Sequence, residues 1–108
     1  AVDLGESVAD AAQREIAEET GVTIELTGLV GIYTDPGHVM AYDDGEIRQQ
    51  FSICFYARLI AGGARQDDTE IKAVQWVDPS DVPSLKIHPS MRRRIDDAIA
   101  GHPEPQIV

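Results

Sequence analysis

The chain is short of cysteine, of basic residues and of long apolar runs. Its 108 residues include one cysteine, Cys54, so an internal disulfide is excluded, and they lack the clustered cysteine and histidine of a structural zinc site. Lys and Arg number 9 against 19 Asp and Glu, a net charge of −10, which disfavours a polynucleotide partner held through its phosphates. No apolar run approaches the roughly 20 residues of a membrane-spanning helix, so no membrane partner is expected.

The rest of the composition is that of an ordinary globular protein. Apolar residues make up 43% and charged residues 26% of the chain, which excludes collagen-like and wholly disordered classes. No repeat, linker or tract of biased composition divides the sequence, so we expect one domain. The opening residues lack the basic start and apolar stretch of a secretory signal, and the expected location is the cytoplasm.

The first predicted element is a helix over Val8 to Thr20. Ser7 followed three residues later by Asp10 is a variant of the capping box, which satisfies amide groups at a helix start. Good helix formers continue to Thr20, and Gly21 provides the C-terminal stop.

Strands are predicted in three further segments. Residues 24–33 read as a strand with a bulge near its glycines, and Ile47 to Leu59 as a strand with clean apolar alternation. Between them, Thr34 to Glu46 contains two turn-forming triplets and predicts a long loop or a loose hairpin. Ile71 to Val77 reads as a strand covered on both faces and anchored by Trp76.

A second helix is predicted to open at Pro89 and to close at Gly101. His88 is expected to cap it, and Arg92-Arg93-Arg94 to form its polar face. Strands interleaved with two amphipathic helices predict an α/β or α+β layered fold, in which Cys54 is a buried small hydrophobe.

Three glutamates share one face of the first predicted helix. Viewed down the helix axis and measured from Glu15, Glu18 lies about 60 degrees to one side and Glu19 about 40 degrees to the other. Glu19 thereby falls on the line of the apolar stripe. These carboxylates repel one another, and Arg14 alone cannot neutralise them. A divalent cation with a preference for oxygen ligands, Mg²⁺ or Mn²⁺, would remove the conflict; the alternative is a solvated acidic face.

The run from Glu6 to Val22 has a wider pattern. Seven residues separate Glu6 from Arg14-Glu15-Ile16-Ala17-Glu18-Glu19-Thr20-Gly21-Val22. This resembles the Nudix box, which asks for Gly, five residues, Glu, seven residues and then Arg-Glu-aliphatic-any-Glu-Glu-any-Gly-aliphatic. Every position from Glu6 onward matches, and a chance match of the six single-type positions is on the order of one in ten million. The leading Gly would precede Ala1, so we expect residues 1–108 to be one Nudix domain without its first strands.

The resemblance implies a fold and a chemistry. The fold is an α/β/α sandwich around a mixed sheet, and the chemistry is hydrolysis of a pyrophosphate bond with Mg²⁺ (or Mn²⁺). Glu15, Glu18 and Glu19 would be the metal ligands, with Glu15 and Arg14 also counted among the catalytic residues. Arg14 would hold the carboxylates in place, and Glu6 would orient the box through Arg14.

A general base outside the box is also implied. In several family members it is an acidic residue on the loop before a strand that carries tryptophan. Glu70 lies six residues before Trp76 and is the candidate, with Asp67 and Asp68 as alternates; the other interpretation is a solvated loop acid.

The long loop supplies candidates for substrate contact. Tyr33, His38, Tyr42 and Arg48 lie in or beside it and could stack on a base or touch phosphate, although each could equally be structural or solvent-facing.

Four functional interpretations follow. The leading one is a pyrophosphohydrolase that cleaves a nucleoside diphosphate linked to another moiety, with ADP-ribose or a nucleotide sugar favoured. The alternatives are a hydrolase that removes oxidised nucleoside triphosphates, a non-catalytic nucleotide-sensing Nudix module, and an acidic structural domain. The expected partner is a small nucleotide, and the resemblance leaves a homodimer open, because dimers are frequent in related enzymes.

Overall fold

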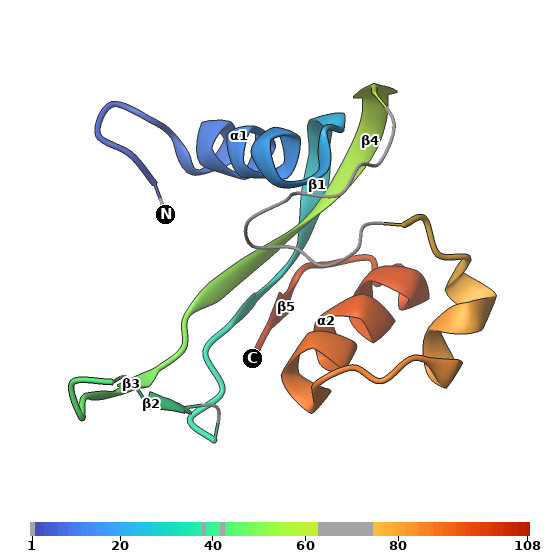
Figure 1. Cartoon of the computed structure of the whole chain (residues 1–108). Coiled ribbons are helices and arrows are strands. Elements are labelled where there is room, and N and C mark those ends of the chain that lie inside the picture. The colour runs from blue at the N-terminus through green and yellow to red at the C-terminus, as the bar shows by residue number, and fades with distance from the viewer. Residues whose placement is uncertain (1, 38, 42, 63–74) are drawn as a thin grey trace. The chain divides into compact units, whose positions relative to one another are not determined.

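The computed structural model describes residues 2–37, 39–41, 43–62 and 75–108 (Figure 1). Two α-helices, a short 3-10 helix and five strands follow one another along these residues: α1 (Val8–Thr20), β1 (Thr23–Tyr33), β2 (Val39–Ala41), β3 (Ile47–Gln49), β4 (Ser52–Ala61), η1 (Pro79–Ser84), α2 (Pro89–Ala100) and β5 (Gln106–Ile107). Helices combined with a mixed sheet confirm the predicted α/β class. None of the helices in this described part is long and apolar enough to cross a membrane.

The strands form two sheets. The larger has the order β4-β1-β5, and β5 runs parallel to β1, with Gly31 opposite Gln106 and Ile32 opposite Ile107. The smaller is the antiparallel pair β2 and β3, in whose backbone register Met40 is paired with Arg48. The hairpin alternative for residues 34–46 is therefore confirmed in part, because β2 lies within these residues whereas its partner β3 follows them.

The chain divides into two compact units. The first unit comprises Ala1–Thr27 and Ala57–Pro83, and the second comprises Gly28–Tyr56 and Ser84–Val108. The described core of the first unit is apolar, with Ala11, Val22 and Val82 buried. The second unit buries Val30 and Tyr33 together with two charged side chains, Arg94 and Asp97.

Helix α1 begins and ends as predicted. The Ser7 hydroxyl accepts the Asp10 amide at 3.0 Å, and the Asp10 carboxylate accepts the Ser7 amide at 3.3 Å, so both halves of the capping box are present. Gly21 has φ +77° and donates its amide to the Ala17 carbonyl, which is the left-handed cap that favours glycine. The side chain of Gln13 accepts the Leu26 amide at 3.3 Å and ties α1 to the start of β1.

The strand predicted over Ile47–Leu59 is wrong in its continuity. The structure divides it into β3 and β4, with Gln50 and Phe51 outside both, and the Phe51 side chain is 64% exposed. The reason is a change of partner, because β3 pairs with β2 whereas β4 belongs to the sheet of β1. The alternation of apolar and polar residues predicts which residues share a face of a strand. It does not predict where the chain leaves one sheet and enters another.

The strand predicted over Ile71–Val77 is not confirmed where the structure describes it. Residues 71–74 lie outside the described residues, and 75–77 belong to no strand. Trp76 is 67% exposed and does not act as the predicted anchor. A bulky apolar side chain becomes core only where another element covers it, and the described residues provide no strand partner for 75–77.

Helix α2 has the predicted ends, but its buried face differs from the prediction. The His88 ring accepts the Ser90 amide at 3.2 Å, which confirms the predicted cap, and Gly101 adopts φ +63° at the other end. The buried positions are Arg94 and Asp97, so the assignment of Arg94 to a polar face is wrong.

Cys54 is half-buried, and burial raises the pKa of its thiol, in keeping with an inert side chain.

Candidate metal and substrate sites

The side chains of the acidic helix face project from α1, which both caps hold in register. Because Arg14 and Glu18 are four residues apart, the helix brings them onto one face, and Arg14 Nη1 donates to Glu18 Oε2 at 3.2 Å. Arg14 Nη2 lies 3.8 Å from Glu15 Oε1. One guanidinium thus contacts two of the three box glutamates.

Glu6 holds Arg14 from the segment before the helix. Arg14 Nε donates to Glu6 Oε2 at 2.7 Å, and Nη2 donates to Oε1 at 3.1 Å, which makes a bidentate pair. The Glu6 side chain is 17% exposed and is further fixed by the amide of Asp3, 2.9 Å from its Oε1. The structure therefore places Glu6 where the sequence predicted it to act, on the arginine.

The pair keeps both groups charged. The hydrogen bond from Arg14 lowers the pKa of Glu6 below its ordinary value, with a smaller contribution from the Asp3 amide. The same bond raises the pKa of Arg14, against the opposing effect of burial. Near neutral pH the guanidinium is therefore a fixed positive group beside the box carboxylates.

The three predicted ligands differ in exposure. Glu18 is exposed, Glu15 and Glu19 are partly buried, and Glu15 and Glu19 lie one helical turn apart. Within the described residues, no three His, Cys, Asp or Glu side chains gather closely enough to hold a metal ion. The donor set itself fits, because carboxylate oxygens are the ligands that Mg²⁺ and Mn²⁺ prefer, and Arg14 already orients two of them.

The other predicted site residues are only partly described. Glu70, its alternates Asp67 and Asp68, and the loop residues His38 and Tyr42 lie outside the described residues. Arg48 donates to Glu46 at 2.6 Å and lowers the pKa of that carboxyl, with both side chains half exposed. Tyr33 is buried, and its hydroxyl donates to Asp97 Oδ2 at 2.8 Å. Tyr33 therefore belongs to the core of the second unit, and its hydroxyl is already engaged.

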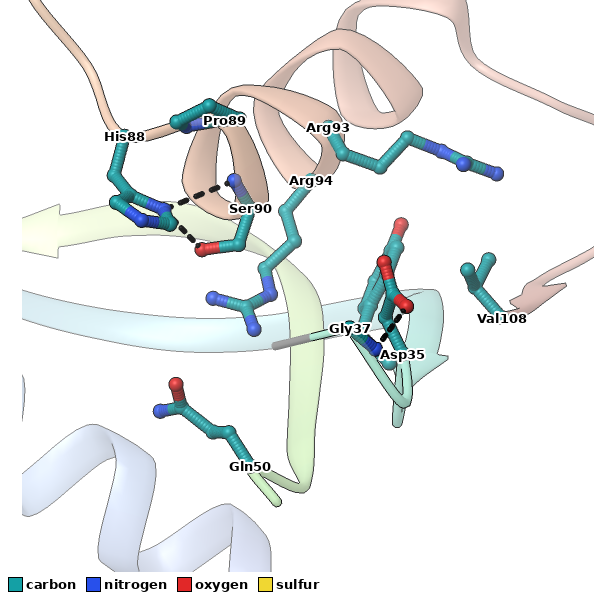
Figure 2. Close-up of a pocket in the computed structure, with 10 residues that line it drawn as sticks. Asp35, Gly37, Gln50, His88, Pro89, Ser90, Arg93, Arg94 and Val108 are labelled. Atoms are coloured by element: carbon teal, nitrogen blue, oxygen red, sulfur yellow. Dashed lines mark hydrogen bonds between the residues drawn. The ribbon is translucent and has the colours of Figure 1, made fainter. Parts of the chain in front are cut away.

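A pocket that the sequence did not predict lies in the second unit (Figure 2). It has a volume of about 280 Å³ and is lined by Tyr33, Asp35, Gly37, Gln50, His88, Pro89, Ser90, Arg93, Arg94 and Val108. The signal that sequence analysis could have used is Arg94, which falls close to the apolar stripe of α2 although it is charged. The pairing of Tyr33 with Asp97, 64 residues away, has no local signal.

Comparison with known proteins agrees with the box geometry. Residues 1–98 match the family model described as NUDIX domain. The chain is 34% identical over 96 residues to the putative 8-oxo-dGTP diphosphatase of Bacillus subtilis (strain 168), covering 89% of this chain and 57% of that protein. It is 33% identical over 89 residues to the ADP-ribose pyrophosphatase of Methanocaldococcus jannaschii, covering 78% of this chain and 46% of that protein.

The chain spans about half the length of these two curated relatives. Nudix hydrolases generally use divalent metal ions, which agrees with an oxygen-rich face such as that of α1. The matched region contains the whole run from Glu6 to Val22, together with α1 and its caps. Because the family model matches residues 1–98 and both relatives are more than 30% identical, the chain belongs to the Nudix family.

Proposed function

We propose that this chain carries the metal-binding helix of a divalent-metal-dependent nucleotide pyrophosphohydrolase. The observation that carries the proposal is the Arg14 guanidinium, which Glu6 grips in a bidentate pair while it contacts Glu15 and Glu18. A purely solvated acidic face would not need an arginine fixed from outside the helix. A metal site needs such an arginine, because the orientation of the carboxylates has to be set before the cation binds.

Each box residue has a role in this proposal. Glu15, Glu18 and Glu19 would hold Mg²⁺ or Mn²⁺, and Arg14 would limit the rotation of Glu15 and Glu18. A bound divalent cation supplies charge neutralisation on the phosphates and a lowered pKa of the attacking water. Glu70 stays the proposed general base, with Asp67 and Asp68 as alternates.

The proposed reaction adds water across a P–O–P bond. With ADP-ribose the products are AMP and ribose 5-phosphate, and with an oxidised nucleoside triphosphate they are the monophosphate and pyrophosphate. We propose a nucleoside diphosphate linked to another moiety as the substrate, which the name of the M. jannaschii relative supports. The name of the B. subtilis relative supports 8-oxo-dGTP as the second candidate.

The test compares both substrates in the presence of Mg²⁺. Cleavage of ADP-ribose is measured as phosphate released by alkaline phosphatase, which acts on AMP and ribose 5-phosphate but not on the intact diphosphate. Cleavage of 8-oxo-dGTP is measured as pyrophosphate, converted to phosphate by inorganic pyrophosphatase. The faster reaction assigns the substrate, and the absence of both would contradict the proposed activity.

A matched pair of variants tests the metal assignment. Glu19→Gln keeps the shape of the side chain but removes a charged ligand, so we expect the turnover to fall at least about a hundredfold. Glu25→Gln makes the same chemical change at an exposed residue of β1 that pairs with Arg58, and we expect unchanged turnover. Equal turnover in Glu19→Gln and the parent, with both folded by circular dichroism, would refute the assignment.

The oligomeric state and cellular location stay predictions. A homodimer predicts twice the chain mass by light scattering, and a cytoplasmic location predicts recovery of the protein in the cytosolic fraction.

A further inference from the structure

Arg94 is a buried cation whose hydrogen-bonding capacity the described residues do not use up. Its side chain extends from α2 into the pocket of the second unit (Figure 2), and the residue is 8% exposed. Its Nε is fully buried and has no hydrogen-bond partner. No carboxylate among the described residues lies within ion-pair distance of its guanidinium, whereas neighbouring Arg93 is paired with Asp97 at 3.1 Å. A buried guanidinium in this state favours binding of an acceptor from outside.

The guanidinium is also held in one orientation. Its Nη1 lies 2.8 Å from Met91 Sδ, and its Cζ lies 5.5 Å from the centroid of the Tyr33 ring. The Tyr33 ring is itself fixed by the bond from its hydroxyl to Asp97. These contacts use Nη1 and one face of the guanidinium, and they leave Nη2 without a described partner. A guanidinium N–H donates a charge-assisted hydrogen bond to an oxygen of a carboxylate or phosphate.

The surroundings add positive potential to the pocket. The N-terminus of α2 opens on its wall through His88, Pro89 and Ser90, and the helix dipole favours an anion there. The first amides of α2 are already bonded, Ser90 to the His88 ring and Met91 to the His88 carbonyl, so the donors for a ligand come from Arg94. Asp35 is the one carboxylate side chain among the described lining residues; it is exposed, and it accepts the Gly37 amide at 2.8 Å.

We propose that this pocket binds an oxyanion, a phosphate or carboxylate group, on the guanidinium of Arg94, through its Nη2 group. No residue of the Nudix box lines the pocket, so the site is additional to the proposed metal site. The proposal goes beyond pyrophosphate hydrolysis, and it does not require a metal ion.

The experiment is a titration followed on the arginine Nε–Hε resonances by ¹H–¹⁵N NMR. It is carried out on the whole chain in the presence of EDTA, so that anions cannot bind through a metal ion on α1. The probes are inorganic phosphate, AMP and acetate at millimolar concentrations. We expect a saturable shift of the Arg94 resonance. Tighter binding of AMP would assign a nucleotide phosphate, equal binding of AMP and phosphate a free phosphate, and tighter binding of acetate a carboxylate.

Two variants separate the pocket from general charge effects. Arg94→Lys keeps the positive charge but removes the planar guanidinium and its Nη2 donor, so we expect anion affinity to fall about tenfold or more. Arg58→Lys makes the same change at an exposed arginine paired with Glu25, and affinity should not change.

The proposal is overturned if no probe produces a saturable shift at Arg94, or if Arg58 and Arg94 respond alike in the parent. Because both of these readouts come from the parent protein, they remain decisive even where Arg94→Lys fails to fold. A failure would leave the metal proposal unaffected, since the titration excludes metal ions.

Discussion

Asp97 is a buried carboxylate with several donors around it. Its Oδ2 accepts from the Tyr33 hydroxyl at 2.8 Å and from Arg93 Nε at 3.1 Å, and its Oδ1 lies 3.4 Å from the His102 ring. Burial alone would raise the pKa of Asp97, but the bonds from Tyr33 and Arg93 outweigh it and lower the pKa below the ordinary value. The ionised form is therefore the one that the fold stabilises.

This gives stability a defined dependence on pH. Because the folded-state pKa is lowered, the contribution of Asp97 is complete above its unfolded-state pKa of about 4 and is lost as pH falls through the folded-state value. We expect Asp97→Asn to be less stable at neutral pH and to lose less further stability on acidification. Urea denaturation at a series of pH values measures this, with exposed Asp96→Asn as control. Acid dependence identical in Asp97→Asn and the parent would contradict the prediction.

At the scale of elements, the predicted features are those set by neighbouring residues. Both ends of α1 and of α2 were predictable because a cap depends on residues within one turn, such as Ser7 with Asp10. The box carboxylates were predictable for the same reason, since one helix carries them. Strand β5 and the change of sheets at Gln50 depend on partners distant in sequence, so no local pattern indicated them. The pocket around Arg94 could not be predicted either, because it forms only where the fold brings Tyr33 against α2.

The pairing of β1 with β5 depends on Gly31. A Cβ at this position would lie 2.6 Å from the Gln106 carbonyl oxygen, a backbone atom that cannot move without disturbing the parallel pair. We expect Gly31→Ala to lower the free energy of unfolding by about 1–3 kcal/mol. Gly28→Ala is the matched control on the same strand, because its Cβ would meet Tyr56 Cδ2 at an ordinary 3.6 Å, and its effect should stay within about 0.5 kcal/mol. Equal effects of the two substitutions in denaturant unfolding would argue against the close approach.

At the scale of the whole molecule, a net charge of −10 makes any cation stabilising to some degree. Screening by salt depends on ionic strength, whereas a specific site responds to Mg²⁺ itself. At matched ionic strength, MgCl₂ should therefore stabilise the parent more than NaCl does. The difference in the free energy of unfolding should approach about 2.7 kcal/mol when Mg²⁺ is at a hundred times its dissociation constant.

Two variants, one in α1 and one in β1, separate stabilisation by a specific Mg²⁺ site from stabilisation by salt screening. Glu19→Gln removes a proposed ligand, so it should lose the excess stabilisation by MgCl₂ and keep the response to NaCl. Glu25→Gln, which changes the net charge by the same amount, should keep both, because its carboxylate only pairs with Arg58 on the protein surface. If Glu19→Gln retains the full excess, the cation binds elsewhere and the carboxylates of α1 are a solvated face. Thermal or urea unfolding of the three proteins in the two salts decides between these outcomes, without any assumption about the substrate.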